Sequence, residues 1–125
     1  MEMIFVFGGA YQGKTGYAME AFGKETVCDV SEAGEPDFTK EIITGIDGFA
    51  ARLVAAGEEP AAWFEARREQ WKNCVLIVND ISQGIVPVDK KLRAVREANG
   101  RLMMYLAREA EQAHRVFCGI GKRIK

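Results

Sequence analysis

The residues best suited to chemistry lie near the start of the chain, where Gly8 to Thr15 reads Gly-Gly-Ala-Tyr-Gln-Gly-Lys-Thr. This spacing has a physical mechanism, because the backbone N–H groups of a tight glycine-rich turn converge on phosphate oxygens. Lys14 adds a positive charge, and Thr15 offers a hydroxyl to a phosphate-bound Mg²⁺. The alternative is a glycine-rich turn with an exposed lysine. We predict a nucleotide-binding loop made of Gly8, Gly9, Ala10, Tyr11, Gln12, Gly13, Lys14, Thr15 and Gly16.

A second candidate group is Asp80, which follows the apolar run Cys74–Val78. An unbroken apolar run fits a central parallel strand that is covered on both faces. A phosphate-binding fold needs a carboxylate at the end of such a strand to hold Mg²⁺, directly or through water. We predict that Thr15 and Asp80 bind the Mg²⁺ ion and that Lys14 and Asp80 are catalytic. The alternative is an aspartate that caps a turn or a helix.

The predicted loop needs a strand before it and a helix after it, because a helix N-terminus adds unpaired N–H groups. Both are expected here: Met3–Phe7 is a short apolar run suited to a strand, and Gly16–Phe22 can continue as a helix. Thr26–Val30 predicts a second strand. Its Asp29 is expected either to touch a ligand or to cap a turn.

The middle of the chain is less clear. Glu41–Ile46 fits either a third strand or the start of a helix, and the helical interpretation is favoured for the part that runs on to Val54. Gly57 is expected to end that helix. Pro60 can open another helix that runs through Trp71.

The last third predicts one long helix, Asp89–Ala113, in which apolar residues recur at spacings of three, four or seven. Gly100 interrupts it, which suggests a bend or a close packing contact. Val116–Cys118 predicts a final strand, followed by a turn at Gly119–Gly121. The apolar stripe of the helix consists of Leu92, Val95, Leu102, Leu106, Ala110 and Ala113.

Strands and helices thus alternate along the chain, which is typical of a parallel sheet with helices on both faces. Together with the glycine-rich loop, this predicts an α/β fold of the three-layer P-loop NTPase (RecA-like) type, with a mostly parallel central sheet. At 125 residues the chain is long enough to bury well over half of its unfolded surface, so residues 1–125 are expected to form a single nucleotide-binding domain.

Composition excludes several classes. No segment approaches the roughly 20 apolar residues of a membrane span, and the apolar run at the N-terminus is too short for a targeting signal. One histidine and three scattered cysteines do not make a zinc site, and reduced cysteines favour the cytoplasm.

Charge is distributed unevenly. Lys90 to Lys125 holds ten Lys or Arg against three Glu, a net charge of +7, whereas residues 1–89 carry −8. A basic third attracts phosphorylated substrates or an acidic face of another subunit, or is simply a solvated helix face. Nucleic acid is not an expected partner, because no recognition motif or interleaved aromatic pattern appears.

Several features together resemble one family. The residues that carry the resemblance are the loop Gly8-Gly9-Ala10 with Gly13-Lys14-Thr15, the pair Asn79-Asp80, the run Gly84-Ile85-Val86-Pro87 with an Arg six residues later, and the ending Gly119-Ile120-Gly121. In these residues the chain resembles the adenosylcobinamide kinase / adenosylcobinamide-phosphate guanylyltransferase family of cobalamin biosynthesis. The likeness covers the first 20 residues and the last 50.

The resemblance implies a two-step activity that uses Mg²⁺ with ATP or GTP. The family phosphorylates the aminopropanol hydroxyl of adenosylcobinamide, a corrinoid, and then transfers GMP from GTP onto that phosphate through a guanylylated histidine. It also implies a homo-oligomer. Candidate contacts to substrate or to a second phosphate are Asn79, Gly84, Arg93 and Arg96.

The chain departs from the family where the histidine nucleophile is expected. Residues 29–73 contain no histidine, and His114 falls at the start of the last predicted strand, where a structural or solvent-facing role is favoured. We therefore predict the kinase step rather than GMP transfer. The alternatives are a non-catalytic nucleotide-binding sensor or subunit and another small P-loop kinase.

Overall fold

The computed structural model describes residues 2–81 and 89–125. Within these ranges the chain forms six strands and five helices, which alternate along most of its length. The strands are β1 Ile4–Gly8, β2 Val27–Asp29, β3 Ile42–Thr44, β4 Val75–Asn79, β5 Gln112–Phe117 and β6 Ile120–Arg123. The helices are α1 Lys14–Phe22, α2 Ile46–Ala55, α3 Pro60–Glu65, α4 Arg68–Trp71 and α5 Lys90–Glu109.

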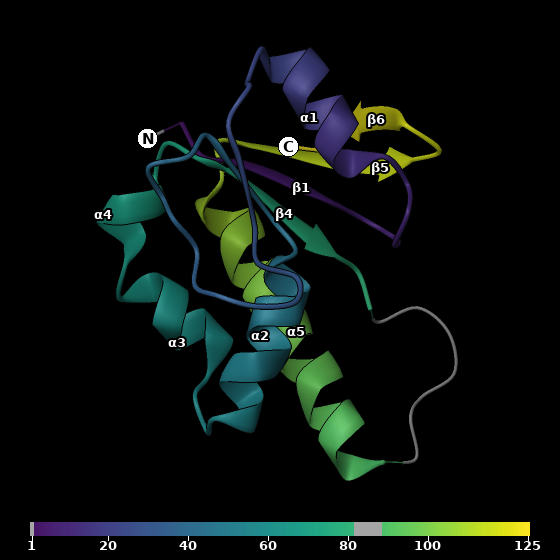
Figure 1. Ribbon diagram of the computed structural model, residues 1–125. Coiled ribbons are helices and arrows are strands. Elements are labelled where there is room, and N and C mark those ends of the chain that lie inside the picture. The colour runs from purple at the N-terminus through teal and green to yellow at the C-terminus, as the bar shows by residue number, and fades with distance from the viewer. Residues whose placement is uncertain (1, 82–88) are drawn as a thin grey trace.

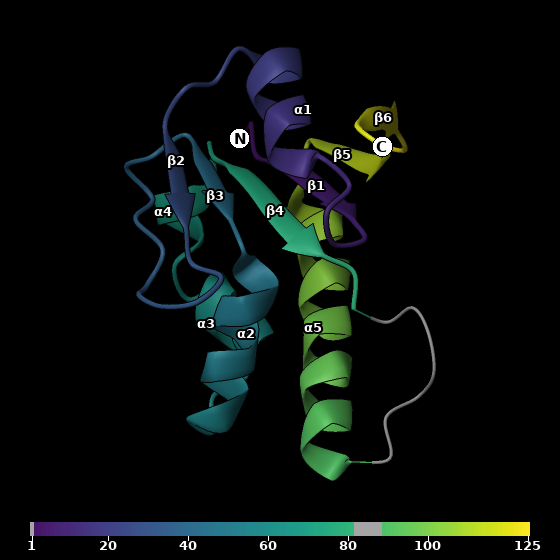
Figure 2. The same cartoon turned by 45° about the vertical axis from the view of Figure 1, so that its right-hand side comes forward.

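The strands form one sheet in the order β2-β3-β4-β1-β5-β6. All neighbouring pairs are parallel except β5 with β6, which is antiparallel. Helix α1 covers one face of the sheet, and α2, α3, α4 and α5 lie on the other (Figure 1, Figure 2). This arrangement confirms the predicted three-layer α/β fold with a mostly parallel sheet, and it brings the ends of β1, β3 and β4 to one edge.

Two hydrophobic clusters hold the layers together. Alternate residues of β4 serve different clusters: Val75 and Ile77 pack on the α1 side, whereas Leu76 and Val78 pack against the larger helical layer. All four side chains are buried. The continuous apolar run therefore has the cause expected from the sequence, a strand covered on both faces.

The ambiguous middle segment contains both of the expected structures in succession. Strand β3 occupies Ile42–Thr44, Gly45 turns the chain with a left-handed φ of 76°, and α2 follows at once. The prediction of one continuous helix from Pro60 through Trp71 is wrong, because the segment forms two separate short helices, α3 and α4. Trp71 is nevertheless fully buried, and its indole N–H donates to the Phe64 carbonyl at 2.7 Å.

The long helix ends earlier than predicted. It stops at Glu109, and Ala110 is already extended with ψ 143°. The N–H of Glu111 donates to the Met3 carbonyl at 2.9 Å, so pairing with the sheet ends the helix before its apolar periodicity does. Ala113 therefore lies in β5.

Two other features of the predicted helix also differ. Leu92, assigned to the buried stripe, is 58% exposed. A Cβ at Gly100 would meet nothing within 4 Å outside its own helix, so close packing does not explain this glycine.

The turn predicted at Gly119–Gly121 is instead at Cys118–Gly119, and a strand that was not predicted, β6, follows it. Cys118 and Gly119 form a two-residue connection in which both φ angles are positive, 51° and 75°, and Phe117 pairs with Ile120 across it. Two positive φ values are typical of the tight turns that match the twist of a hairpin. The end of the chain thus folds back as β6.

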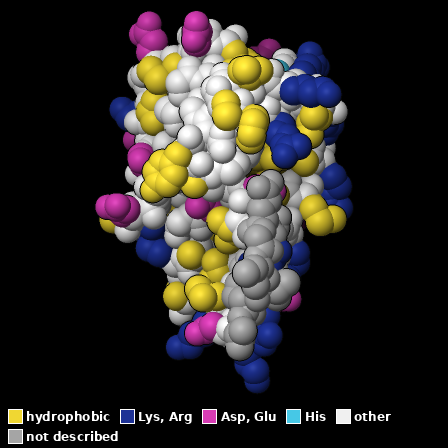
Figure 3. Space-filling model, turned by 90° about the vertical axis from the view of Figure 1, so that its right-hand side faces the viewer, with side chains coloured by type: hydrophobic (Ala, Val, Ile, Leu, Met, Phe, Trp, Pro, Cys, Tyr) yellow, Lys and Arg dark blue, Asp and Glu magenta, His cyan; other side chains and the backbone are white. Residues whose placement is uncertain are grey.

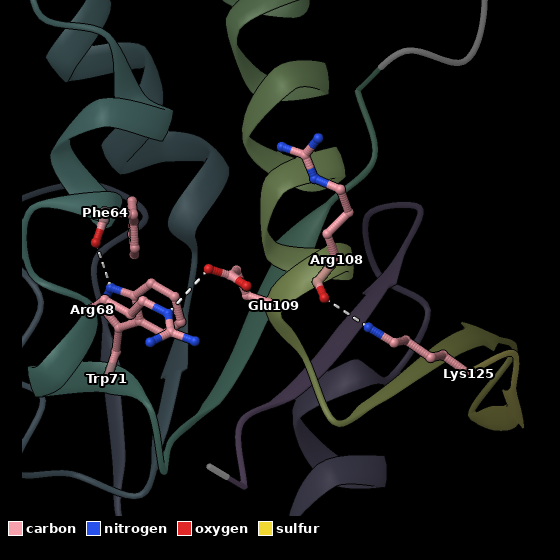
Figure 4. A network of polar contacts seen from close by, with 6 residues as sticks. All are labelled: Phe64, Arg68, Trp71, Arg108, Glu109 and Lys125. Carbon is pink, nitrogen blue, oxygen red and sulfur yellow. Dashed lines mark hydrogen bonds and ion pairs between the residues drawn. The ribbon is translucent and has the colours of Figure 1, made fainter.

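Polar contacts link the short helices and the chain end to α5 (Figure 4). Arg68 forms an ion pair with Glu109 at 3.0 Å. The Lys125 ammonium donates to the carbonyls of Ala107 and Arg108 at 2.9 and 2.8 Å. A cation at a helix C-terminus is favourable because the last carbonyls carry partial negative charge.

The β5–β6 hairpin exposes apolar side chains beside basic ones. Phe117 and Ile120 are paired across the strands and largely exposed, and Arg115 lies opposite Lys122. Figure 3 views the molecule from the side of this hairpin and shows hydrophobic side chains next to lysine and arginine. Within residues 2–81 and 89–125, no helix is long and apolar enough to cross a bilayer.

Candidate functional site

The glycine-rich segment forms a loop between β1 and α1. Strand β1 ends at Gly8, Gly13 adopts a left-handed φ of 80°, and α1 begins at Lys14. The N-cap residue, Gly13, has no side chain with which to cap the first turn of α1, so it leaves the N–H groups of that turn uncapped. A helix N-terminus of this kind is suited to bind an anion, because the N–H groups and the helix dipole point the same way.

The loop is anchored to the β5–β6 hairpin. The Gln12 carbonyl accepts from the Gly119 N–H at 2.7 Å, and the Gln12 side-chain oxygen accepts from the Cys118 N–H at 2.7 Å. A Cβ on Gly13 would lie 3.2 Å from the Gly119 Cα. Tyr11, at the tip, is fully exposed and has a φ of 60°. The hairpin that the sequence did not predict therefore supports the loop.

Two glycines of the loop region make a matched test of this packing. A Cβ on Gly8 would lie 2.4 Å from the Val116 carbonyl oxygen, whereas a Cβ on Gly16 would meet nothing within 4 Å. We expect Gly8→Ala to lower the free energy of unfolding by about 1–3 kcal/mol, because backbone must move to make room. Gly16→Ala should raise it by about 0.5–1 kcal/mol, because alanine favours a helix. Urea denaturation measures both, and equal effects would contradict the prediction.

The Lys14 side chain folds back onto its own loop. Its side chain is buried, and its ammonium donates to the Gly9 carbonyl. Burial lowers the pKa of the Lys14 ammonium, and the negative charge of Asp47 acts in the opposite direction. The lysine is thus a desolvated cation directed into the loop, where its attraction for an anion is stronger than it would be in bulk water.

Residues with oxygen-bearing side chains lie in the loop and at the strand ends beside it. The Thr15 hydroxyl lies 3.3 Å from the hydroxyl of Thr44, at the end of β3. The Asp80 N–H donates to the Gly8 carbonyl at 2.8 Å, so the backbone of Asp80 lies beside Gly8, the first residue of the loop. Hydroxyl and carboxylate oxygens are ligands that Mg²⁺ accepts, usually with several waters retained. The residues present therefore fit that ion, although the described residues hold no group of three or more His, Cys, Asp and Glu suited to a metal.

Sequence reasoning missed an acidic residue at this edge, Asp47 in the first turn of α2. Its two carboxylate oxygens accept from the backbone N–H and the side-chain amide of Asn79, at 3.1 and 3.3 Å. The buried Asn99 of α5 donates in turn to the Asn79 carbonyl at 3.1 Å. The signal in the sequence was an acid shortly after a short apolar strand, but that strand was itself ambiguous.

The remaining predicted contacts are distributed differently. Asn79 lies at the site, next to Asp47. Arg93 and Arg96 are partly buried on the N-terminal part of α5, and Arg93 lies six residues, or about 9 Å along the helix, from Asn99. Contact of either arginine with substrate or with a second phosphate stays a prediction. Gly84 lies outside the described residues.

The two residues whose roles were left open have structural partners. The Asp29 carboxylate accepts from the Ser31 N–H at 2.9 Å, as expected of a residue that caps a turn. His114 is buried under α1; its Nδ1 lies 3.0 Å from the Tyr17 hydroxyl, and its Nε2 lies 2.9 Å from the Gln112 side-chain oxygen. Both ring nitrogens are therefore engaged.

His114 should make stability depend on pH. Burial, and then the positive charge of Arg123, lower the pKa of this imidazole below its ordinary value of 6.5. The folded protein therefore resists protonation, so its stability is complete above the unfolded pKa and decreases as the pH falls through the folded pKa. Between about pH 7.5 and about pH 5, the free energy of unfolding should fall more steeply in the wild type than in His114→Phe. Denaturation curves measured across this range test this, and identical slopes would contradict it.

Comparison with known proteins supplies independent information. A search of curated proteins found no relative that matches the chain. A family described as cobinamide kinase / cobinamide phosphate guanyltransferase matches residues 45–124, which include α2, β4, α5 and the whole β5–β6 hairpin but not the glycine-rich loop. This match covers more than half of the sequence and agrees with the resemblance noted in the last 50 residues. The chain therefore belongs to the cobinamide kinase / cobinamide phosphate guanyltransferase family.

Proposed function

We propose that this protein is a P-loop phosphotransferase that uses ATP or GTP with Mg²⁺ to phosphorylate the aminopropanol hydroxyl of adenosylcobinamide. The observation that carries the proposal is the position of Lys14. It is a buried cation in a glycine-rich loop at an uncapped helix N-terminus, within a chain of a family of cobinamide kinases.

The loop residues bind the triphosphate. The Lys14 ammonium donates to the Gly9 carbonyl. A phosphate oxygen is a better acceptor than this carbonyl because it carries negative charge, so nucleotide binding redirects Lys14 toward the phosphates. The N–H groups of Gly13, Lys14 and Thr15 complete the cradle, and the backbone of Gly8 and Gly9 forms its entrance.

The chemistry needs positioning and charge neutralisation more than covalent participation by the protein. Thr15 and Asp80 would hold Mg²⁺, which supplies positive charge to the phosphates. Lys14 stabilises the charge that develops on the transferred group. Because the loop is fixed to the β5–β6 hairpin through Gln12, its donors are aligned before the substrate arrives.

The kinase step is proposed in preference to GMP transfer. A guanylylated intermediate needs a free nucleophilic nitrogen, and the only histidine in the sequence, His114, is buried with both nitrogens engaged. His114 also lies opposite Val6, two residues before β1 reaches the loop. The histidine is therefore a buried residue of the sheet that packs against α1.

Product analysis tests the proposal. Purified protein with Mg²⁺, adenosylcobinamide and ATP or GTP should produce adenosylcobinamide phosphate, detected by chromatography and mass spectrometry. A control reaction without the corrinoid measures background hydrolysis. Nucleotide-dependent thermal stabilisation without any corrinoid product would favour a non-catalytic sensor or subunit. Phosphorylation of a different acceptor would identify another small P-loop kinase.

A further inference from the structure

The carboxylate of Asp47 is held in a place where an isolated negative charge would hinder nucleotide binding. Its hydrogen-bond partner Asn79 lies opposite Gly8, the first residue of the predicted phosphate-binding loop, in the sheet. Its negative charge also acts on the Lys14 ammonium of that loop. A carboxylate beside a triphosphate repels it, and the repulsion is strong in a partly desolvated site. Such a group is compatible with the site only if a cation lies between it and the phosphates.

The carboxylate is also fixed in orientation. Asn79 donates to both of its oxygens, through the backbone N–H at 3.1 Å and the side-chain amide at 3.3 Å. Asn79 itself is held by Asn99, whose buried amide donates to its carbonyl. A chain of hydrogen bonds from α5 through β4 thus holds Asp47, and each carboxylate oxygen keeps acceptor capacity for a further partner.

The neighbouring hydroxyls indicate where that partner belongs. Thr44 lies three residues before Asp47, and its hydroxyl is 3.3 Å from that of Thr15, which is the predicted magnesium residue of the loop. The two hydroxyls thus lie together where β3 ends, and Asn79, which holds the Asp47 carboxylate, ends the neighbouring strand β4. These hard oxygen donors suit a hydrated Mg²⁺, which retains water ligands that need acceptors.

We infer that Asp47 is a positioning residue for the magnesium–nucleotide complex, whose carboxylate, held by Asn79, accepts hydrogen bonds from the water ligands of the phosphate-bound ion. This inference rests on the proposed nucleotide binding and adds a second acid to Asp80. It assigns to Asn79 the task of orienting Asp47. It also explains why a negative charge is held beside the phosphate-binding loop.

The test compares ATP affinity with and without metal. Isothermal titration calorimetry of the full chain gives the dissociation constant of ATP in excess Mg²⁺ and in EDTA. The wild type should bind ATP more tightly with Mg²⁺. Asp47→Asn should reduce this metal-dependent gain by about tenfold or more, as expected for an outer-sphere partner of a metal. Its affinity for ATP in EDTA should be unchanged or higher, because the repulsive charge is gone.

A direct metal readout is the affinity of the protein–ATP complex for Mn²⁺, followed by electron paramagnetic resonance. It should weaken by about tenfold in Asp47→Asn. Asn79→Ala removes one of the two donors and should give a smaller loss in the same direction, which keeps the test available if Asp47→Asn is poorly folded. Asp29→Asn is the matched control: it removes the same charge at the end of β2, three strands from β1, and should leave both affinities unchanged.

The outcomes separate the inference from the proposed function. If the wild type binds ATP in neither condition, the proposed function fails and the inference falls with it. If the wild type binds and phosphorylates but Asp47→Asn keeps the full metal-dependent gain, only the inference is overturned. An equal loss of ATP affinity with Mg²⁺ and in EDTA also overturns it, because Asp47 would then act through Lys14 alone.

Discussion

Replacement of Lys14 with alanine should lower the rate of adenosylcobinamide phosphorylation by at least about 10³-fold, equivalent to about 4 kcal/mol of transition-state stabilisation. The reason is that the ammonium is a desolvated charge inside the loop, and no other described side chain of the loop segment, residues 8–16, is cationic. The measurement is kcat/KM for the corrinoid with saturating Mg²⁺ and nucleotide. The dissociation constant of the nucleotide should also increase.

A second variant separates the loss of charge from the loss of shape. Lys14→Met keeps an unbranched stem of similar length in the buried position but cannot donate to phosphate. It should be as inactive as Lys14→Ala and should have a higher melting temperature than Lys14→Ala. Lys40→Ala, which removes an exposed lysine from the loop between β2 and β3, should retain full activity. Activity in Lys14→Met close to that of the wild type would show that the ammonium is not the catalytic group.

The importance of Lys14 depends on parts of the chain that are distant in sequence. The loop is held by Gln12 against Cys118 and Gly119 at the hairpin turn. Asp47 of α2 opposes the effect of burial on the Lys14 pKa. The family match covers both of these partners but not the loop itself, so the segment shared with the family includes residues that support the predicted phosphate-binding loop.

Local sequence patterns predicted most of the elements that frame the site. The apolar runs around Phe5 and Leu76 became central strands, and the helix expected over Gly16–Phe22 is present but begins two residues earlier, at Lys14. These signals depend on neighbouring residues alone. The end of α5 could not be predicted in this way. Ala110 and Ala113 continue the helical periodicity, but pairing of Glu111 and Gln112 with the start of the chain is a long-range interaction.

The hairpin was missed for a different reason. Cys118-Gly119 is a weak hairpin signal, since asparagine or aspartate usually precedes the glycine in such turns. A positive φ at Cys118 is tolerated because Gln12 accepts a hydrogen bond from its N–H. That support comes from the opposite end of the chain and is invisible to local reasoning. Asp47 was missed because its approach to Lys14 depends on how β3 and β4 lie in the sheet.

Some of the basic residues in the last third of the chain are engaged in contacts within the fold. Arg101 of the basic third makes two contacts of 3.0 Å with Glu59 of the acidic part, and Lys125 is engaged by the C-terminal carbonyls of α5. The exposed pair Arg115 and Lys122 remains on the outer face of the hairpin. The homo-oligomer implied by the family stays a prediction, and analytical ultracentrifugation of the full chain measures it.

Incubation with GTP and Mg²⁺ should leave the intact mass of the protein unchanged. Covalent GMP transfer through a histidine needs an exposed, nucleophilic ring nitrogen, whereas His114 is buried with both nitrogens engaged and residues 29–73 contain no histidine. Mass spectrometry of the undigested protein should therefore detect no GMP adduct, while the same mixture with adenosylcobinamide should yield the phosphate and no GDP-linked product.

A parallel measurement shows whether the absence of a GMP adduct is caused by a failure of the protein to bind GTP. Thermal unfolding measured in parallel should show stabilisation by GTP, which demonstrates that the site is filled while no adduct forms. His114→Phe should behave as the wild type in both assays, because the imidazole takes no part in the reaction. An adduct that survives in His114→Phe would contradict the prediction and would require a non-histidine nucleophile. Loss of the adduct in that variant would instead mean that the α1 layer opens to expose His114, against the packing of Tyr17 and Phe22 on its ring.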